Sequence, residues 1–283
     1  MTAPPAILFD AFYDQAAHAG RVRPYVVCSS PRSGSTLLCH LLIRAGGLGV
    51  PAEYLTRSAD LDPLLRRAGV TGTTDPPELE RYLDWLFRYR SGPDGMFGIQ
   101  LQFNQVEDRA RAPALQKLLR HARFVYLVRR DPMAQAISFA MARGTRRFHE
   151  AADAPRSDEA PRFDLRQVRE ASKAIALEAF GWSAFFEANR IQPLTMAYED
   201  MMADPGWTCR RIAEFLGAAT PAEVALDDLP LRRQRSPAYD AWRDALLRHF
   251  RIGSRTGTAD ARGIDDGPAY RAGPGPRPDE EQP

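Results

Sequence analysis

Hydrophobic residues along the chain follow two kinds of spacing. Short runs typical of buried strands occur at residues 25–30, 97–103, 123–130 and 193–199. Apolar residues three or four positions apart, as on one face of a helix, occur at 34–47, 131–144, 168–186 and 236–250. Strands that alternate with helices in this way predict an α/β fold, in which helices flank both faces of a central parallel sheet.

Composition separates a single domain from a tail. Residues 1–252 carry the apolar pattern, whereas 253–283 are rich in Gly, Pro and charge, which predicts a flexible tail. No segment approaches the roughly 18 apolar residues of a transmembrane segment, and no signal peptide is visible, so we expect a cytoplasmic protein. The three cysteines follow no disulfide or metal-site spacing. The net charge of +2 argues against a nucleic-acid partner.

The segment SSPRSGST connects the first predicted strand to the first predicted helix. Backbone N–H groups at a helix N-terminus have no partner within the helix, and the helix dipole adds positive potential. Gly34 permits close approach of a ligand, and Arg32 adds a positive charge. Hydroxyl groups come from Ser33, Ser35 and Thr36. This pattern predicts a phosphate-binding loop; the alternative is a capped turn that binds nothing.

The loop differs from the G-x-x-x-x-G-K-[ST] loop of nucleotide triphosphatases, because it is shorter and contains no Lys. A nucleotide kinase is therefore the runner-up function. A non-catalytic nucleotide-binding scaffold is a further alternative.

A second candidate anion site follows the strand at 123–130. Arg130 ends this strand, and Ser138 lies in the second turn of the next predicted helix. An Arg fork and a Ser hydroxyl can hold one phosphate together. The neighbouring Arg129 is a competing candidate for this phosphate. In the alternative interpretation, Arg130 is a solvated charge at the end of the strand and Ser138 is a hydroxyl within the helix.

The motif SSPRSGSTLL resembles the 5′-phosphosulfate loop of sulfotransferases that use 3′-phosphoadenosine-5′-phosphosulfate (PAPS). With the following GGLGVPAEYL, it is most similar to the bacterial branch that includes trehalose 2-sulfotransferase and the Nod-factor sulfotransferases. The resemblance continues in FGIQLQFNQ, VYLVRRDPMAQAISF, MAYEDMMADP and LRRQRSPAYDAW, and covers about residues 25–250. It implies the P-loop-like sulfotransferase fold and a homodimer. It also implies sulfuryl transfer from PAPS, without a metal, to a hydroxyl of a carbohydrate, glycolipid or similar metabolite.

The resemblance implies roles for several residues in donor binding. Arg32 would stabilise the leaving oxygen. The family's spacing of Arg, Pro and Ser fits Arg130, Pro132 and Ser138, which assigns the 3′-phosphate to Arg130.

Two further residues match family segments near the nucleotide. Tyr198 would lie by the adenine, and Arg233 would belong to a basic loop over the nucleotide. A core Tyr and a solvated Arg are the alternative interpretations.

Glu53, in GVPAEYL, matches the proposed general base of the same branch, and partial burial would raise its pKa. His149 is the competing base. Gln100 stands where the family leads us to expect a Lys, so the acceptor stays undefined, and this residue is the one feature that favours a scaffold. Tyr54, Gln102 and Asn104 are candidates for an acceptor pocket or for structural roles.

Overall fold

The computed structural model describes residues 5, 7–145, 162–230 and 237–252. The chain divides into two units, Met1–His249 and Phe250–Pro283. The first unit is an α/β domain, and it contains all of the elements described below except Phe250, the last residue of the last helix. The predicted domain boundary after residue 252 and the flexible tail beyond it stay predictions.

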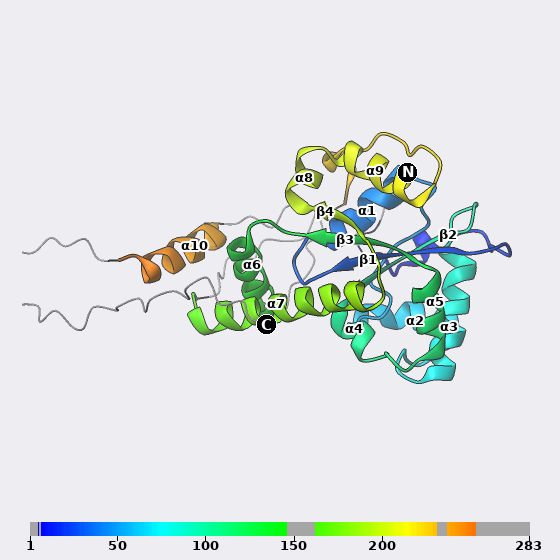
Figure 1. Cartoon of the computed structure of the whole chain (residues 1–283), viewed down its shortest axis with the longest axis horizontal. Coiled ribbons are helices and arrows are strands. Elements are labelled where there is room, and N and C mark those ends of the chain that lie inside the picture. Colours follow the sequence, from blue (N-terminus) through cyan, green and yellow to red (C-terminus); the bar gives the residue numbers. More distant parts are fainter. Residues whose placement is uncertain (1–4, 6, 146–161, 231–236, 253–283) are drawn as a thin grey trace, which may run out of the picture. The chain divides into compact units, whose positions relative to one another are not determined.

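A four-stranded sheet forms the centre of the domain (Figure 1). Its strands are β1 (Arg23–Ser29), β2 (Met96–Gln102), β3 (Arg123–Val128) and β4 (Leu194–Ala197). They lie in the order β2-β1-β3-β4, and every neighbouring pair is parallel. The parallel sheet predicted from the apolar runs is therefore confirmed, with β1 at its centre between β2 and β3.

Helices connect and cover the strands. Their bounds are α1 Ser35–Ala45, α2 Asp62–Ala68, α3 Pro76–Tyr89, α4 Phe103–Glu107, α5 Pro113–His121, α6 Pro132–Thr145, α7 Leu165–Ala188, α8 Tyr198–Ala203, α9 Pro205–Leu216 and α10 Pro237–Phe250. Short 3-10 turns lie at Ala11–Tyr13, Ala59–Leu61 and Leu226–Asp228. None of the described helices is long and apolar enough to cross a membrane.

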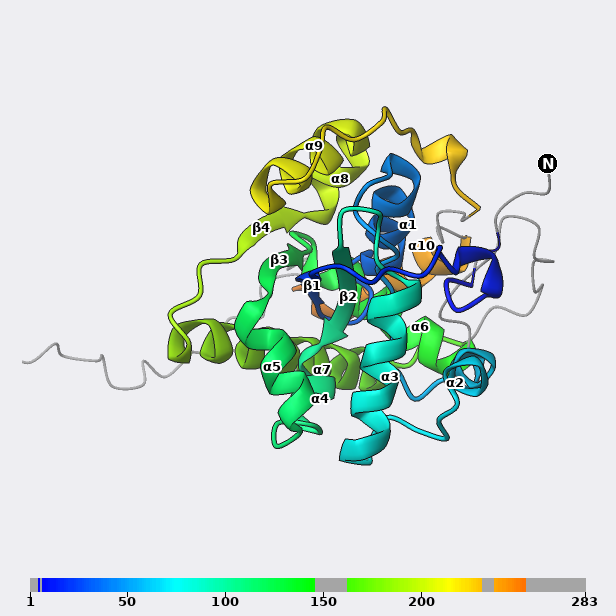
Figure 2. The same ribbon diagram turned by 90° about the vertical axis from the view of Figure 1, so that its right-hand side faces the viewer.

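Alternate residues of β1 pack into two separate cores. Val26 and Cys28 belong to a cluster with buried residues of α3, α5 and α7. Tyr25 and Val27 face the opposite cluster, with α1, α8 and α9. Figure 2 shows these two groups of helices on opposite faces of the sheet. A strand that is apolar at every position is what a sheet covered on both faces requires, so the predicted layering is confirmed.

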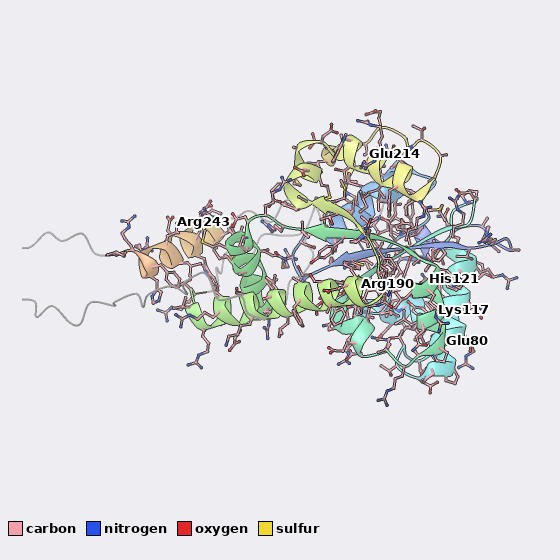
Figure 3. The ribbon with its side chains drawn as sticks, in the orientation of Figure 1. Glu80, Lys117, His121, Arg190, Glu214 and Arg243 are labelled. Carbon is pink, nitrogen blue, oxygen red and sulfur yellow. The ribbon has the colours of Figure 1, made fainter. Side chains whose placement is uncertain are left out.

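A third apolar cluster joins α6, α7 and α10. Ile137, Ala171 and Trp242 are among its buried members. An ion pair at 3.5 Å links Arg243 on α10, labelled in Figure 3, to Asp131 at the start of α6. Asp131 also caps α6, because its Oδ1 accepts from the backbone N–H of Ala134 at 2.8 Å. These contacts hold the start of α6 next to α10.

The sheet order determines where a ligand can bind. The chain leaves β1 toward β2 on one side and returns to β3 on the other, so the two directions diverge at the carboxyl end of β1. In open parallel sheets, ligands bind in the crevice at such a point. The loop after β1 and the arginines after β3 both lie at this edge.

Candidate active site

Carbonyl groups of the turn between β1 and α1 accept hydrogen bonds from side chains elsewhere in the domain. Three side chains donate to them: Trp182 Nε1 to Ser29 O at 3.1 Å, Gln135 Nε2 to Pro31 O at 2.7 Å, and Arg129 Nη1 to Arg32 O at 3.2 Å. In the described part of the chain, the backbone N–H groups of Gly34, Ser35 and Thr36 have no acceptor. Ser33 Oγ is buried without a hydrogen-bond partner. A turn with filled acceptors and unfilled donors suits an anion.

The backbone of this turn adopts an uncommon conformation. Arg32 has a φ of 63°, and Gly34 has a φ of 94°. A Cβ atom on Gly34 would lie 2.5 Å from Cδ2 of Tyr198, so the Tyr ring occupies the space that only glycine leaves open. This close packing places Tyr198, which begins α8, against the anion-binding loop.

Two arginines lie together at this loop. The Arg32 guanidinium donates through Nε to Ser138 Oγ at 3.1 Å. The Arg129 guanidinium lies 4.7 Å from the centre of the Tyr198 ring, and its Nε is buried without a partner. Burial, together with the nearby positive charge of Arg129, lowers the pKa of Arg32 to about 10. Such a pair of crowded cations attracts an anion strongly.

Arg130 has a different environment from Arg129. Its guanidinium forms a bidentate ion pair with Asp200, with both N···O distances at 2.6 Å, and its side chain is 60% exposed. The backbone N–H of Arg130 donates to the Glu199 carboxylate at 3.0 Å. The structure therefore brings Arg32, Ser138 and Tyr198 together with Arg129, while Arg130 turns to Asp200.

Glu53 lies among three glutamine side chains on the other side of β1. Its Oε1 accepts from Gln105 Nε2 at 2.7 Å and from Gln102 Nε2 at 3.0 Å, and its Oε2 accepts from Gln100 Nε2 at 3.3 Å. Burial is the main cause that raises the pKa of Glu53 to about 7; the charge of Glu178 adds to this rise, and the hydrogen bonds from the three glutamines oppose it. A carboxylate that titrates near neutral pH can accept a proton from a hydroxyl group.

One side chain connects the carboxylate to the loop. Gln100 Nε2 lies 3.3 Å from Glu53 Oε2 and 3.5 Å from the hydroxyl of Ser29, the last residue of β1. The parallel register places Gln102 opposite Ser29. The predicted base and the predicted anion loop therefore meet at the carboxyl end of β1.

Sequence reasoning did not identify two residues that support Glu53. Gln105 supplies the shortest of its hydrogen bonds. Glu178 on α7 accepts from the backbone N–H groups of Phe103 and Asn104, and so anchors the start of α4, which carries Gln105. The polar positions of LQFNQ after a strand were a signal for Gln105, but nothing local in the sequence indicates Glu178.

Four further predicted site residues are not part of these two groups. His149 and Arg233 lie outside the described residues. Tyr54 is fully buried and donates its hydroxyl to Val50 O at 2.5 Å, which is a structural role. Asn104 is exposed.

A cavity of about 710 Å³ lies away from these groups, between α4, α5 and the end of α7. Its lining includes Phe103, Leu115 and Phe185. None of the residues of the anion loop or around Glu53 lines it.

Comparison with known proteins agrees with the motifs and the geometry. The Stf0 sulphotransferase family matches residues 24–248. The chain belongs to this family. Membership confirms the predicted sulfotransferase and its fold, and decides against the nucleotide kinase.

The similar proteins include two trehalose 2-sulfotransferases. That of Mycobacterium tuberculosis is 26% identical over 79% of this chain and 94% of its own length. That of Mycolicibacterium smegmatis is 25% identical over 77% of this chain and 92% of its own length. Among solved structures, a sulfotransferase domain from the curacin biosynthetic pathway is 14% identical, covers 81% of this chain and 99% of its own, and has a TM-score of 0.44.

Replacement of Gly34 by Ala tests the packing of the loop against Tyr198. Gly34→Ala should lower the affinity for 3′-phosphoadenosine 5′-phosphate (PAP) by about 10-fold or more, because the Tyr198 ring must move. Calorimetric titration measures this. Gly47→Ala is the matched control, because Gly47 has a φ of 73° and no atom within 4 Å of the added Cβ. It should lose only about 1 kcal/mol of stability and keep its affinity for PAP. Equal affinities in the two variants would show that Tyr198 does not shape the loop.

Proposed function

We propose that this sulfotransferase moves a sulfuryl group from PAPS to a hydroxyl group of a carbohydrate, glycolipid or similar small metabolite. One observation carries the proposal. At the end of β1, the anion-binding loop with its positively charged Arg32 lies close to Glu53, a carboxylate whose pKa is raised. The trehalose 2-sulfotransferases among its relatives support a carbohydrate acceptor.

The loop residues suit the 5′-phosphosulfate group of the donor. The unfilled N–H groups of residues 34–36 and the buried Ser33 hydroxyl would hold its oxygens. Arg32 would neutralise the negative charge that develops on the leaving phosphate oxygen. These donors supply the positive charge that the transfer needs, so we expect turnover without a divalent metal.

The second set of residues suits the 3′-phosphate and the adenine. Arg130 and Ser138 would hold the 3′-phosphate, with Arg130 exchanging the Asp200 carboxylate for phosphate. Tyr198, held between Gly34 and Arg129, offers a ring near the adenine. The role expected for Arg233 also stays a proposal.

Glu53 would act as the general base. As the acceptor oxygen forms its bond to sulfur, the proton of that hydroxyl passes to the Glu53 carboxylate. The bond between sulfur and the bridging oxygen breaks, and its electron pair stays on the phosphate of PAP, next to Arg32. Glu53 must be ionised, so turnover should rise as the pH increases through about 7. The bound anionic donor should move this rise to higher pH, because a nearby negative charge opposes ionisation.

Nucleotide affinities test the second phosphate site. PAP should bind roughly 10- to 100-fold more tightly than AMP, because a charge-assisted hydrogen bond contributes about 1.5–3 kcal/mol. Arg130→Ala should narrow this difference and leave AMP binding nearly unchanged. Arg129→Gln should weaken the binding of both PAP and AMP, because the Arg129 side chain supports the loop by donating to Arg32 O. Calorimetry that gives equal affinities for PAP and AMP in the unaltered protein would exclude the second phosphate site.

Glu53→Gln tests the base and the overall function. With labelled PAPS and a panel of sugars, glycolipids and phenols, the unaltered enzyme should transfer sulfate to at least one acceptor. Glu53→Gln should bind PAP normally but turn over roughly 10²- to 10⁴-fold more slowly, because its amide cannot accept the proton. Arg32→Ala should weaken both donor binding and turnover.

His149→Ala is the control for the competing base and should cost much less than Glu53→Gln. An inactive His149→Ala enzyme beside a normal Glu53→Gln enzyme would reverse the assignment. Tight PAP binding without sulfation of any acceptor in the panel would favour the alternative of a non-catalytic nucleotide-binding scaffold.

We further propose a cytoplasmic homodimer. The buried free thiols of Cys28, Cys39 and Cys209 support a reducing compartment. One face of α7 supports self-association, because it exposes Leu177 (69%) and Phe180 (72%).

The charges on this face of α7 suit a two-fold axis. Lys173 and Glu187 lie seven residues before and after Phe180. In an antiparallel pairing centred on Phe180, Lys173 would face the partner's Glu187, and Leu177 and Phe180 would be covered.

Phe180→Asp should therefore convert a dimer into a monomer of 31.6 kDa in light scattering. Leu247→Asp, at an apolar residue that is 46% exposed on α10, is the matched control and should stay dimeric. A monomeric unaltered protein would contradict the proposal.

A further inference from the structure

The cavity between α4, α5 and the end of α7 has an apolar interior. Its volume of about 710 Å³ lies within the range of roughly 300–1,000 Å³ that is typical of small-ligand pockets. Leu115 and Phe124, which are 1% and 4% exposed, belong to its lining. Phe103, Leu119 and Phe185 also line it and are partly buried. This interior can enclose an apolar chain or ring system.

The mouth of the cavity is polar and carries positive charge. The exposed polar residues in its lining include Gln116 and Arg120 on α5, Arg123 at the start of β3, and Asn189 and Gln192 after α7. Lys117 and Arg190, both labelled in Figure 3, adjoin lining residues on α5 and after α7. Among the residues that the structure describes, no carboxylate forms an ion pair with any of these four cations. The mouth therefore attracts an anion.

The two exposed arginines in the lining keep hydrogen-bond donors for a ligand. Arg123 Nη1 donates to Phe215 O, and the Arg123 guanidinium lies 5.7 Å from the centre of the Phe215 ring. Arg120 Nη2 makes a long contact of 3.5 Å with Gln116 Oε1. A guanidinium has five N–H donors, so these contacts leave several of them unused. Glu107 is the one carboxylate in the described lining, and it opposes a larger number of cations.

The cavity is separate from the surfaces already assigned. Phe103 on α4 lines it, whereas Gln105 on the same helix donates to Glu53. The proposed dimer face of α7 also points elsewhere, because Phe185 follows Phe180 by five residues, or about 140° around the helix. A molecule in the cavity would therefore be a second ligand, in addition to the donor and the acceptor.

We propose that this cavity binds an amphiphilic anion, a molecule with an apolar chain or ring system and one carboxylate, phosphate or sulfate head group. The interior would bury the apolar part, and Arg120 and Arg123 would meet the head group at the mouth. A concave pocket of this volume suits one enclosed chain rather than the flat surface of a membrane. The site does not depend on the proposed sulfuryl transfer.

Three probes with the same eight-carbon chain test the chemistry of the ligand. Octyl sulfate should bind the full chain more tightly than 1-octanol, and octyltrimethylammonium should bind most weakly, in calorimetric titrations below micelle-forming concentrations. Decyl sulfate should bind about 4- to 16-fold more tightly than octyl sulfate, because each buried methylene group contributes about 2- to 4-fold. Equal affinities for octyl sulfate and octyltrimethylammonium would overturn the inference.

A charge reversal tests the mouth of the cavity. Arg120→Glu should lower the affinity for octyl sulfate about 10-fold or more and leave that for 1-octanol unchanged. Arg66→Glu is the matched control, because Arg66 is also exposed and also lies in the last turn of a helix. It should bind octyl sulfate normally. Equal losses of affinity in the two variants would show that the attraction is not specific to the cavity.

A larger side chain tests the interior. Leu119→Trp should fill part of the cavity and weaken the binding of both octyl sulfate and 1-octanol. Leu247→Trp, at a partly exposed Leu on α10 outside the lining, is the matched control and should keep both affinities. If Leu119→Trp does not fold, the exposed position of Arg120 keeps the test of the site valid. Normal binding of both probes to a folded Leu119→Trp protein would contradict the inference.

Further measurements separate the other possible binding modes. Arg32→Ala should bind octyl sulfate as the unaltered protein does; loss of binding there, with normal binding in Arg120→Glu, would place the sulfate in the anion-binding loop. Binding to phosphatidylglycerol vesicles without binding of octyl sulfate would make this surface a membrane contact. A changed mass of Leu119→Trp in light scattering, without binding of any probe, would make it an interface between copies. Each of these three results would overturn the inference.

Discussion

Hydrogen bonds to the carbonyl groups of the turn between β1 and α1 are the constraint on which the rest of the site depends. The carbonyl groups of Ser29, Pro31 and Arg32 accept from Trp182 on α7, Gln135 on α6 and Arg129 in the segment after β3, respectively. Because buried backbone groups must be paired, the carbonyls hold the turn in one conformation and leave its N–H groups for a ligand. Trp182 is itself fully buried and stacks on Phe186 at 5.6 Å between ring centres, so the packing of α7 reaches the turn directly.

The same turn brings like charges together. Burial and the nearby charge of Arg129 lower the pKa of Arg32, and a protein gains nothing in stability from such a pair of cations alone. The ring of Tyr198 partly compensates, because it faces the Arg129 guanidinium at 4.7 Å. Gly34 makes this possible by leaving room for the ring. The proposed binding of an anion would explain this arrangement.

Features that depend on nearby residues could be predicted from the sequence, and features that depend on packing could not. The strands, the main helices and the loop at 29–36 follow from spacing and composition, and the structure contains them. Gly34 lies in the loop where the motif places it. Ser138 contacts Arg32, whereas the motif pairs it with Arg130. The different directions of Arg129 and Arg130 are set by contacts with Tyr198 and Asp200, which lie about 70 residues away along the chain. Glu178 was not identified for the same reason, because its partners Phe103 and Asn104 become neighbours only when α7 packs on the sheet.

The position of β1 between β2 and β3 explains how one site can hold opposite chemistries. Parallel strands lie about 4.8 Å apart, so residues that follow β3 and residues on β2 both reach the end of β1 from opposite sides. The β3 side carries Arg129 and is cationic, whereas the β2 side carries Gln100 and Gln102 and is neutral. The cationic side suits the anionic donor that we propose, and the neutral side carries the proposed base, Glu53. The order β2-β1-β3 places these two sides across a single strand, and Ser29 of β1 pairs with Gln102 of β2 and with Leu127 of β3.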